Sequence, residues 1–171
     1  MIVPFRNEAT NLPNLLKDLA TIKYPSDKWE VILVDDHSTD NFRPTAYNVL
    51  PSSSPARKAA ITTGIDAAKG DIIATTDADC RVTSLWLQKI NLAFQDPKIQ
   101  MMVGGVRIEE DDTFFSQLQA LEFVSVAVTG GATLGLGFPT MCNGANFIIP
   151  PKNIHRSWWL CWQRKRFFGR R

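Results

Sequence analysis

"DIIATTDADCRV", residues 71–82, is an apolar run that ends in two carboxylates. Asp77 and Asp79 are separated only by Ala78. Neighbouring ionised carboxylates raise each other's pKa and lose hydration, so a strand that ends in two of them needs a compensating positive charge. The stretch therefore predicts a buried strand with a charged site at its carboxyl end.

An apolar run that ends in polar residues occurs twice earlier in the chain. "MIVPF", residues 1–5, precedes the polar sequence "RNE", and "WEVILVDD", residues 29–36, ends in two aspartates. Runs with little polar alternation are expected of strands that are covered on both faces. Helical spacing or composition predicts helices at residues 12–22, 58–69, 84–94 and 114–128, and further strands are expected at 46–50 and 101–108. This alternation predicts an α/β fold, a mostly parallel sheet with helices on both faces.

The polar clusters that follow these strands should share one edge of the sheet. Ligands of open α/β sheets bind beyond the carboxyl ends of the strands, so we expect residues 6–8, 35–36 and 77–79 to form one site. A divalent cation would suit it, because Mg²⁺ takes one or two protein carboxylates together with substrate phosphates and waters. The structural alternative is that Asp77 caps the helix near Ser84 while Asp79 is solvated.

Length and composition indicate one ordinary soluble domain. The chain has 171 residues, of which 44% are apolar and 21% charged, and its net charge of +2 gives no general case for binding nucleic acid or a membrane. Its three cysteines are an odd number without CxxC spacing, which fits a reducing, cytoplasmic compartment. The opening residues lack the features of a signal peptide.

Residues 123–151 carry no charged side chain. A spanning helix needs about 20 predominantly apolar residues, and glycines, a proline and an asparagine interrupt this stretch. We expect it to be buried protein or a wall of the site, with membrane insertion as the alternative.

Four segments, taken together, resemble the successive motifs of glycosyltransferase family 2, over nearly everything from Met1 to about Phe147. They are "IVPFRNEATNLPNLLKDL" (2–19), "WEVILVDDHSTDN" (29–41), "RKAAITTGIDAAKGDIIATTDADC" (57–80) and "FPTMCNGANF" (138–147). The resemblance implies the Rossmann-like GT-A fold and transfer of a sugar, with inversion, from a nucleotide-sugar donor to a glycan or lipid-linked acceptor. It also implies Mg²⁺ or Mn²⁺ as cofactor, and members are often attached to the inner face of the cell membrane.

The resemblance assigns the first two motifs to the nucleoside. Pro4 and Glu8 match positions that line the nucleoside pocket. Asp36 matches the carboxylate that recognises the base, typically uracil, and Asp35 lies beside it. Glu8 has a structural alternative, as a carboxylate that caps the following helix.

The third motif is assigned to the diphosphate and the metal. Arg57 and Lys58 match the basic position near the base or diphosphate, although Lys58 could be a solvated helix charge. Asp77 and Asp79 match the D-x-D pair of the family, with Asp79 expected as the metal ligand.

The fourth motif is assigned to the donor sugar and the acceptor. Asn143, Gly144 and Asn146 match the segment that closes over the donor sugar and faces the acceptor. An inverting transferase also needs a general base for the acceptor hydroxyl, which the family places in an Asp beyond this motif. The chain has no Asp or Glu after Glu122, so we expect weak or no transfer, with nucleotide binding retained.

The last residues differ from the family in composition. Residues 150–171 are basic and rich in tryptophan, and with synonymous codons the next reading frame can encode a string that resembles the family's continuation. We therefore expect residues 1–149 to be the nucleotide-sugar-binding part of the domain, and residues 150–171 to be an out-of-frame, disordered tail. The alternative is an interfacial membrane anchor.

Three other functions are compatible with parts of the sequence. "VILVDDHS" also resembles the acidic pair of a phospho-receiver domain, with Asp77 as its phosphorylated residue. A nucleotidyltransferase would use a related sheet, but it needs a glycine-rich loop that "PFRNEATN" lacks. A non-catalytic binder of sugar nucleotides is the third alternative.

Overall fold

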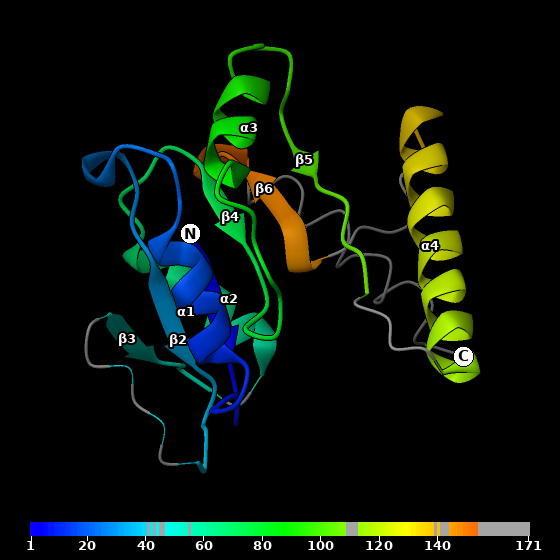
Figure 1. The fold of residues 1–171 in the computed structure, drawn as a ribbon. Coiled ribbons are helices and arrows are strands. Elements are labelled where there is room, and N and C mark those ends of the chain that lie inside the picture. The colour runs from blue at the N-terminus through cyan, green and yellow to red at the C-terminus, as the bar shows by residue number, and fades with distance from the viewer. Residues whose placement is uncertain are drawn as a thin grey trace, which may run out of the picture.

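The computed structural model describes residues 1–40, 42, 44, 47–54, 56–108, 113–138, 140 and 144–153. Six strands form one sheet in the order β3-β2-β1-β4-β6-β5 (Figure 1). The strands are β1 (Ile2–Phe5), β2 (Ile32–Asp35), β3 (Asn48–Pro51), β4 (Ile73–Thr75), β5 (Met102–Val103) and β6 (Phe147–Ile149). The helices are α1 (Leu12–Ala20), α2 (Arg57–Ala67), α3 (Trp86–Ala93) and α4 (Phe114–Gly135).

The sheet is mostly parallel, as the sequence predicts. β1 pairs in parallel with β2 and β4, and β2 pairs in parallel with β3. β6 is the exception, because it runs antiparallel to both β4 and β5. The carboxyl ends of β1, β2 and β4 therefore lie at one edge, and the strand order reverses between β1 and β4, which is where ligands of such sheets bind.

Pro4 explains why the ladder between β1 and β4 is short. β1 pairs with β2 along its whole length but with β4 only at Ile2. The carbonyl of Ile2 accepts from the Thr76 N–H at 3.2 Å, so the backbone of Ile2, and of Pro4 two residues on, faces β4. Proline has no N–H to donate, so Pro4 cannot continue the ladder to β4 beyond Ile2. The ladder therefore ends short of the carboxyl ends, where the sequence predicts the site.

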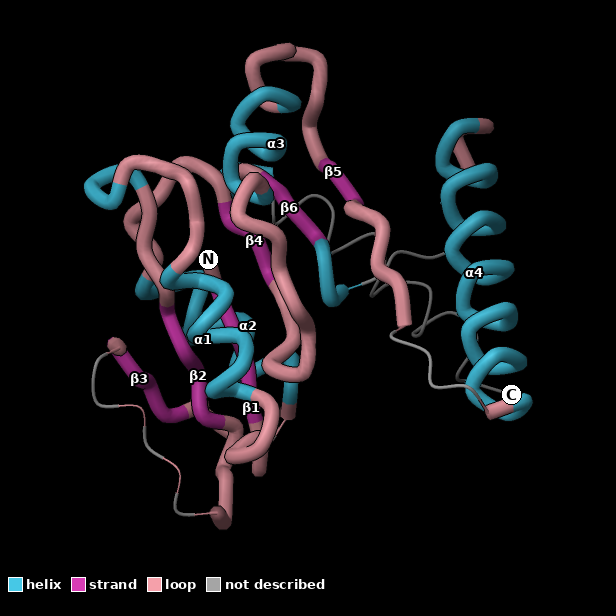
Figure 2. Tube along the Cα trace, viewed as in Figure 1, coloured by secondary structure: helices cyan, strands magenta, loops and turns pink. Residues whose placement is uncertain are grey.

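Helices cover both faces of the sheet, which confirms that prediction (Figure 2). On one face, three leucines of α1 pack against alternate residues of β1 and β2 such as Val3 and Leu33. On the other face, Ala60 of α2 packs against the intervening residues, which include Ile2 and Ile32. The two-residue period of strands sends successive side chains to opposite faces, so continuous apolar runs serve both helices.

The connection from β2 to β3 contains no helix in its described residues, 36–40, 42, 44 and 47. A crossover between parallel strands usually carries one. β3 confirms the strand predicted at about residues 46–50. The predicted reduction of the helix agrees with the described residues of the connection.

α4 corrects the prediction for the uncharged stretch. It extends from Phe114 to Gly135, and only Ala120 and Gly130 of its residues are buried. Leu121 is 66% exposed and Val128 is 64% exposed, so this part of the stretch is not buried protein. The helix stands apart from the sheet (Figure 1), and it is long and apolar enough to cross a membrane by length and composition. Gly130 and Gly131 do not interrupt the helix, which ends at Gly135, before Gly137 with its positive φ of 79°.

The proposed boundary at residue 149 coincides with the end of β6. Most of the predicted out-of-frame tail, residues 154–171, lies outside the described residues.

Candidate functional site

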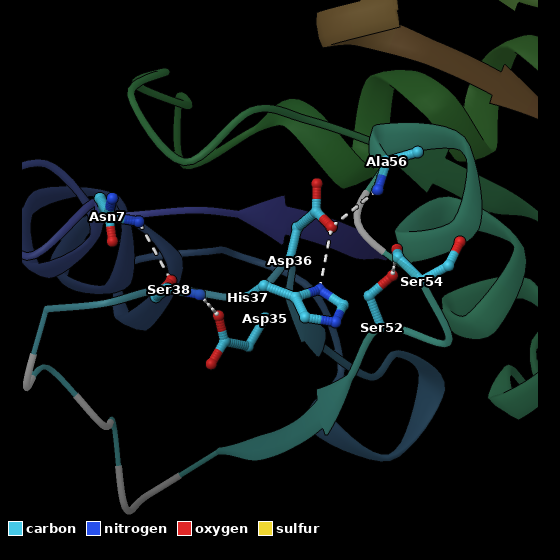
Figure 3. Close-up of polar contacts among 8 residues, drawn as sticks. All are labelled: Asn7, Asp35, Asp36, His37, Ser38, Ser52, Ser54 and Ala56. Carbon is cyan, nitrogen blue, oxygen red and sulfur yellow. Dashed lines mark hydrogen bonds and ion pairs between the residues drawn. The ribbon is translucent and has the colours of Figure 1, made fainter.

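Asp36 follows β2 and its carboxylate is buried, with 9% of the residue exposed. Its Oδ1 accepts from the Ala56 N–H at 3.1 Å and lies 3.5 Å from Nδ1 of His37 (Figure 3). Ala56 is the residue before the first turn of α2, where an anion is favoured by the helix dipole. Asp36 thus fixes the start of α2 against the end of β2.

The neighbouring Asp35 organises a turn (Figure 3). Its Oδ1 accepts from the Ser38 N–H at 2.8 Å, and the Ser38 hydroxyl oxygen accepts from the Asn7 N–H at 3.0 Å. This connects the loop after β1 to the loop after β2. Asp35 therefore supports the two loops beside the site rather than facing a ligand in these contacts.

Asn7 belongs to the polar cluster expected at the site, residues 6–8, but sequence analysis gave it no role of its own. Its φ of 58° lies in the left-handed region, which asparagine tolerates better than most residues. Its side-chain Oδ1 accepts from the N–H groups of Thr39 and Asp40, at 2.7 and 3.2 Å. An asparagine two residues after a predicted strand is the signal that could have identified it, because asparagine is common where a turn needs side-chain hydrogen bonds.

Glu8 is engaged at the start of α1. Its Oε2 accepts from the side-chain amide of Asn11 at 2.8 Å, and its carbonyl accepts from the Leu12 N–H at 2.9 Å. The Glu8 carboxylate thus holds the side chain of Asn11, the residue before α1, and does not itself accept from a helix N–H in these contacts. Its assignment to the nucleoside pocket stays a prediction, as does its alternative as a helix cap.

Arg57 is the first residue of α2, and its guanidinium forms an ion pair with the carboxylate of Asp77 at the end of β4. The Arg57 side chain is 52% exposed and that of Asp77 is 25% exposed. Lys58, the other predicted basic residue, is exposed on the helix. Of the two, Arg57 is the one that the structure brings to the D-x-D pair.

The D-x-D segment places its two carboxylates differently. Ala78 is buried in the core, Asp77 is half-buried and Asp79 is exposed. The Cys80 N–H donates to the Asp77 carbonyl at 3.2 Å, which closes a turn around the pair. Burial raises the pKa of the Cys80 thiol, so this cysteine is not an activated nucleophile.

Of the predicted acceptor-side residues, Gly144 lies at the site. A Cβ on Gly144 would lie 3.5 Å from Nη2 of Arg57, and the Gly144 carbonyl accepts from the Thr75 hydroxyl at 2.8 Å. Thr75, which sequence analysis did not single out, thus connects the end of β4 to this turn. Asn143 lies outside the described residues.

Asn146 is occupied by contacts within the protein. Its Oδ1 accepts from Nε1 of Trp86 and its amide nitrogen donates to the Gly105 carbonyl, both at 3.2 Å. The side chain also packs on Gly104, where a Cβ would overlap it. These contacts connect α3, the segment after β5 and β6, so they give Asn146 a structural role, and its assignment to the donor sugar stays a prediction.

The predicted residues therefore fall into two groups. Asp36, Arg57, Asp77 and Gly144 are linked through the first turn of α2, whereas Glu8 and Asp35 support the adjoining loops. Within the described residues, no three histidine, cysteine or acidic side chains cluster as a metal site. Two carboxylates are nevertheless what Mg²⁺ or Mn²⁺ needs when substrate phosphates complete the shell.

The topology contradicts the phospho-receiver alternative. A receiver has the strand order 2-1-3-4-5, whereas this sheet has the order 3-2-1-4-6-5 with one antiparallel strand. The acidic pair also follows the second strand here rather than the first.

Comparison with known proteins gives consistent matches. The profile described as "Glycosyl transferase family 2" matches residues 1–167. Glycosyltransferase AglE of Haloferax volcanii is 28% identical over 144 residues, covering 73% of this chain and 47% of that protein. An undecaprenyl-phosphate 4-deoxy-4-formamido-L-arabinose transferase of Pseudomonas savastanoi pv. phaseolicola is 33% identical over 141 residues, or 75% of this chain and 41% of that protein. The chain thus spans less than half of these relatives.

Among solved structures, the mannosyltransferase PcManGT of Pyrobaculum calidifontis, in complex with GDP-Man and Mn²⁺, is similar in fold. Its TM-score is 0.65 at 22% identity, covering 91% of this chain and 45% of that chain.

Proposed function

The chain belongs to glycosyltransferase family 2 and has the GT-A fold, and on this premise we propose that it is the donor-binding part of an enzyme that moves a sugar from a UDP-sugar, with inversion, to a glycan or lipid-linked acceptor. The chain spans under half of its relatives, so the proposal concerns the donor-binding half of such an enzyme.

The observation that supports the proposal is the convergence of Asp36, Arg57 and Asp77 where the strand order reverses. Asp36 is a buried acceptor suited to the N–H of a nucleotide base. Arg57 carries a planar cation suited to phosphate oxygens. The base and the diphosphate would then lie across the first turn of α2.

Asp79 and Asp77 would hold the Mg²⁺ or Mn²⁺ of the proposed reaction. The Arg57 guanidinium is paired with Asp77, so this carboxylate is placed to bind a cation. Bound there, the metal would neutralise charge that develops on the departing diphosphate. Asp36 and Arg57 would orient the donor for that departure.

The proposed acceptor and location follow from the relatives and from α4. Relatives include transferases named for undecaprenyl phosphate and dodecaprenyl phosphate, which are lipid carriers. We propose a lipid-linked or glycan acceptor at the cytoplasmic face of the cell membrane. The exposed apolar surface of α4 is compatible with contact to lipid.

The acceptor base is the part that this chain lacks by composition, since no carboxylate follows Glu122. We propose that the chain binds donor nucleotide but transfers sugar weakly or not at all, as a sugar-nucleotide binder. Robust transfer by the 171-residue chain would contradict this part.

Calorimetry with UDP, with and without Mn²⁺, tests the proposal. We expect uptake that requires Mn²⁺, and at least about tenfold weaker uptake in Asp79→Ala, because a contact to a charged group is worth about 1.5–3 kcal/mol. Asp66→Asn, an exposed carboxylate near the other end of α2, is the matched control and should bind as the wild type does. GDP in place of UDP tests the base. Uptake that ignores Mn²⁺ or the Asp79 change would refute the proposal.

A further inference from the structure

We propose that Arg57 is an exchangeable counter-ion of Asp77, which occupies the carboxylate until donor and metal arrive together and then transfers to the diphosphate. The inference rests on the proposed function and deepens it, because it makes metal binding depend on the nucleotide. The observation behind it is the ion pair between the first residue of α2 and the end of β4.

The geometry keeps Arg57 within reach of both partners. Asp36 holds the Ala56 N–H, so the backbone beneath Arg57 is fixed while its long side chain is free to turn about its own bonds. The guanidinium lies next to both Asp77 and Gly144, so it bridges the end of β4 and the turn before β6. A small rotation of the side chain would therefore exchange one anion for another without movement of the helix.

The exposure of the pair makes the exchange feasible. Half of the Arg57 side chain is exposed, and ion pairs with such exposure contribute little net stability. A divalent cation carries twice the charge of the guanidinium, so it is a stronger partner for the carboxylates. The diphosphate beside the cation is in turn a stronger partner for the guanidinium. The pair thus blocks adventitious metal but yields to the metal–nucleotide complex.

Linkage then requires that metal and nucleotide favour each other. Metal that binds without nucleotide must displace the guanidinium from Asp77. Only the unpaired fraction of Asp77 can bind metal, so the apparent affinity for metal is the intrinsic affinity multiplied by that fraction. Nucleotide that attracts Arg57 removes this penalty, and by reciprocity metal strengthens nucleotide binding by the same factor.

The test measures Mn²⁺ binding to the full chain without nucleotide, with electron paramagnetic resonance used to determine the concentration of free Mn²⁺. Arg57→Ala should bind Mn²⁺ about fivefold more tightly than the wild type, equivalent to about 1 kcal/mol. Lys69→Ala, which removes one positive charge at the far end of α2, should not change the affinity. Unchanged or weaker Mn²⁺ binding by Arg57→Ala would overturn the inference.

A double-mutant cycle separates the ion pair from a general charge effect. In an Asp77→Asn background, Arg57→Ala should leave Mn²⁺ affinity unchanged, because no carboxylate remains to be released. Tightening that persists in this background would overturn the inference. Arg57→Gln provides a second variant, and thermal unfolding followed by circular dichroism identifies which of the two remains folded.

UDP distinguishes this inference from the proposed function. With Mn²⁺ present, Arg57→Ala should bind UDP about tenfold more weakly, because the diphosphate loses a charged partner. If the wild type takes up no UDP while Arg57→Ala still binds Mn²⁺ more tightly, the proposed function fails and the counter-ion role is supported.

Discussion

The sheet body and α4 are both rich in apolar side chains, but the sheet body buries them and α4 exposes them. In the sheet body, defined here as β1–β6 with α1–α3, residues such as Ile2 and Leu33 are wholly buried. In α4, Leu121 and its neighbours are exposed. Composition thus sets the tendency of a side chain to leave water, while its burial requires a complementary surface within reach. The sheet supplies that surface to α1, α2 and α3, and the described chain supplies little of it to α4.

Truncation of leucine in each region should give the largest contrast. Leu15 of α1 is fully buried against β1 and β2, so Leu15→Ala should lower the free energy of unfolding by about 3 kcal/mol. Leu121→Ala is the matched control, because the side chain is 66% exposed and the effect should stay within about 0.5 kcal/mol. Urea unfolding followed by circular dichroism measures both. Equal effects would mean that α4 is packed as the sheet body is.

The amino terminus makes the stability of the sheet body depend on pH. The amine of Met1 is buried at the start of β1 and donates to the Glu30 carbonyl at 2.8 Å, and burial lowers its pKa from 8.0 to about 6. Between pH 6 and 8 the unfolded chain therefore binds the proton and the folded chain does not, so stability should rise with pH over this window. Two pKa units correspond to about 2.7 kcal/mol.

Urea unfolding at intervals from pH 5.5 to 8.5 measures this contribution of Met1. A chain acetylated at its amino terminus is the control, and it should lack the rise. A rise of the same size in the acetylated chain would assign the titration to another group.

Glycine to alanine changes should have opposite signs in the two regions. A Cβ on Gly64 of α2 would lie 2.5 Å from Cγ2 of Ile2, which is fully buried. Gly64→Ala should therefore lower the free energy of unfolding by about 2 kcal/mol, despite the better helix propensity of alanine. A Cβ on Gly131 of α4 would meet no neighbouring atom within 4 Å, so Gly131→Ala should raise helix content without loss of stability. Circular dichroism and urea unfolding test both; a tolerated Gly64→Ala would show that α2 can shift on the sheet.

Sequence patterns predicted the parts of the molecule that repeat a local rule. β1, β2 and β4 were expected from apolar runs, and their carboxyl ends do lie at one edge with the acidic residues. The role of Asn146 was missed because its partners, Trp86 and Gly105, are 60 and 41 residues away in sequence. No local pattern encodes such pairs.

Local sequence patterns were enough to predict the α/β class, the parallel core strands and the acidic residues at their ends, because strand periodicity and turn chemistry act over a few residues. The pairing of Arg57 with Asp77, the link that Asn7 makes between two loops and the exposure of α4 appear only in the folded protein. Each of these depends on which surfaces meet after the chain has folded. Contacts between distant residues follow from the packing of whole elements, which no short stretch of sequence specifies.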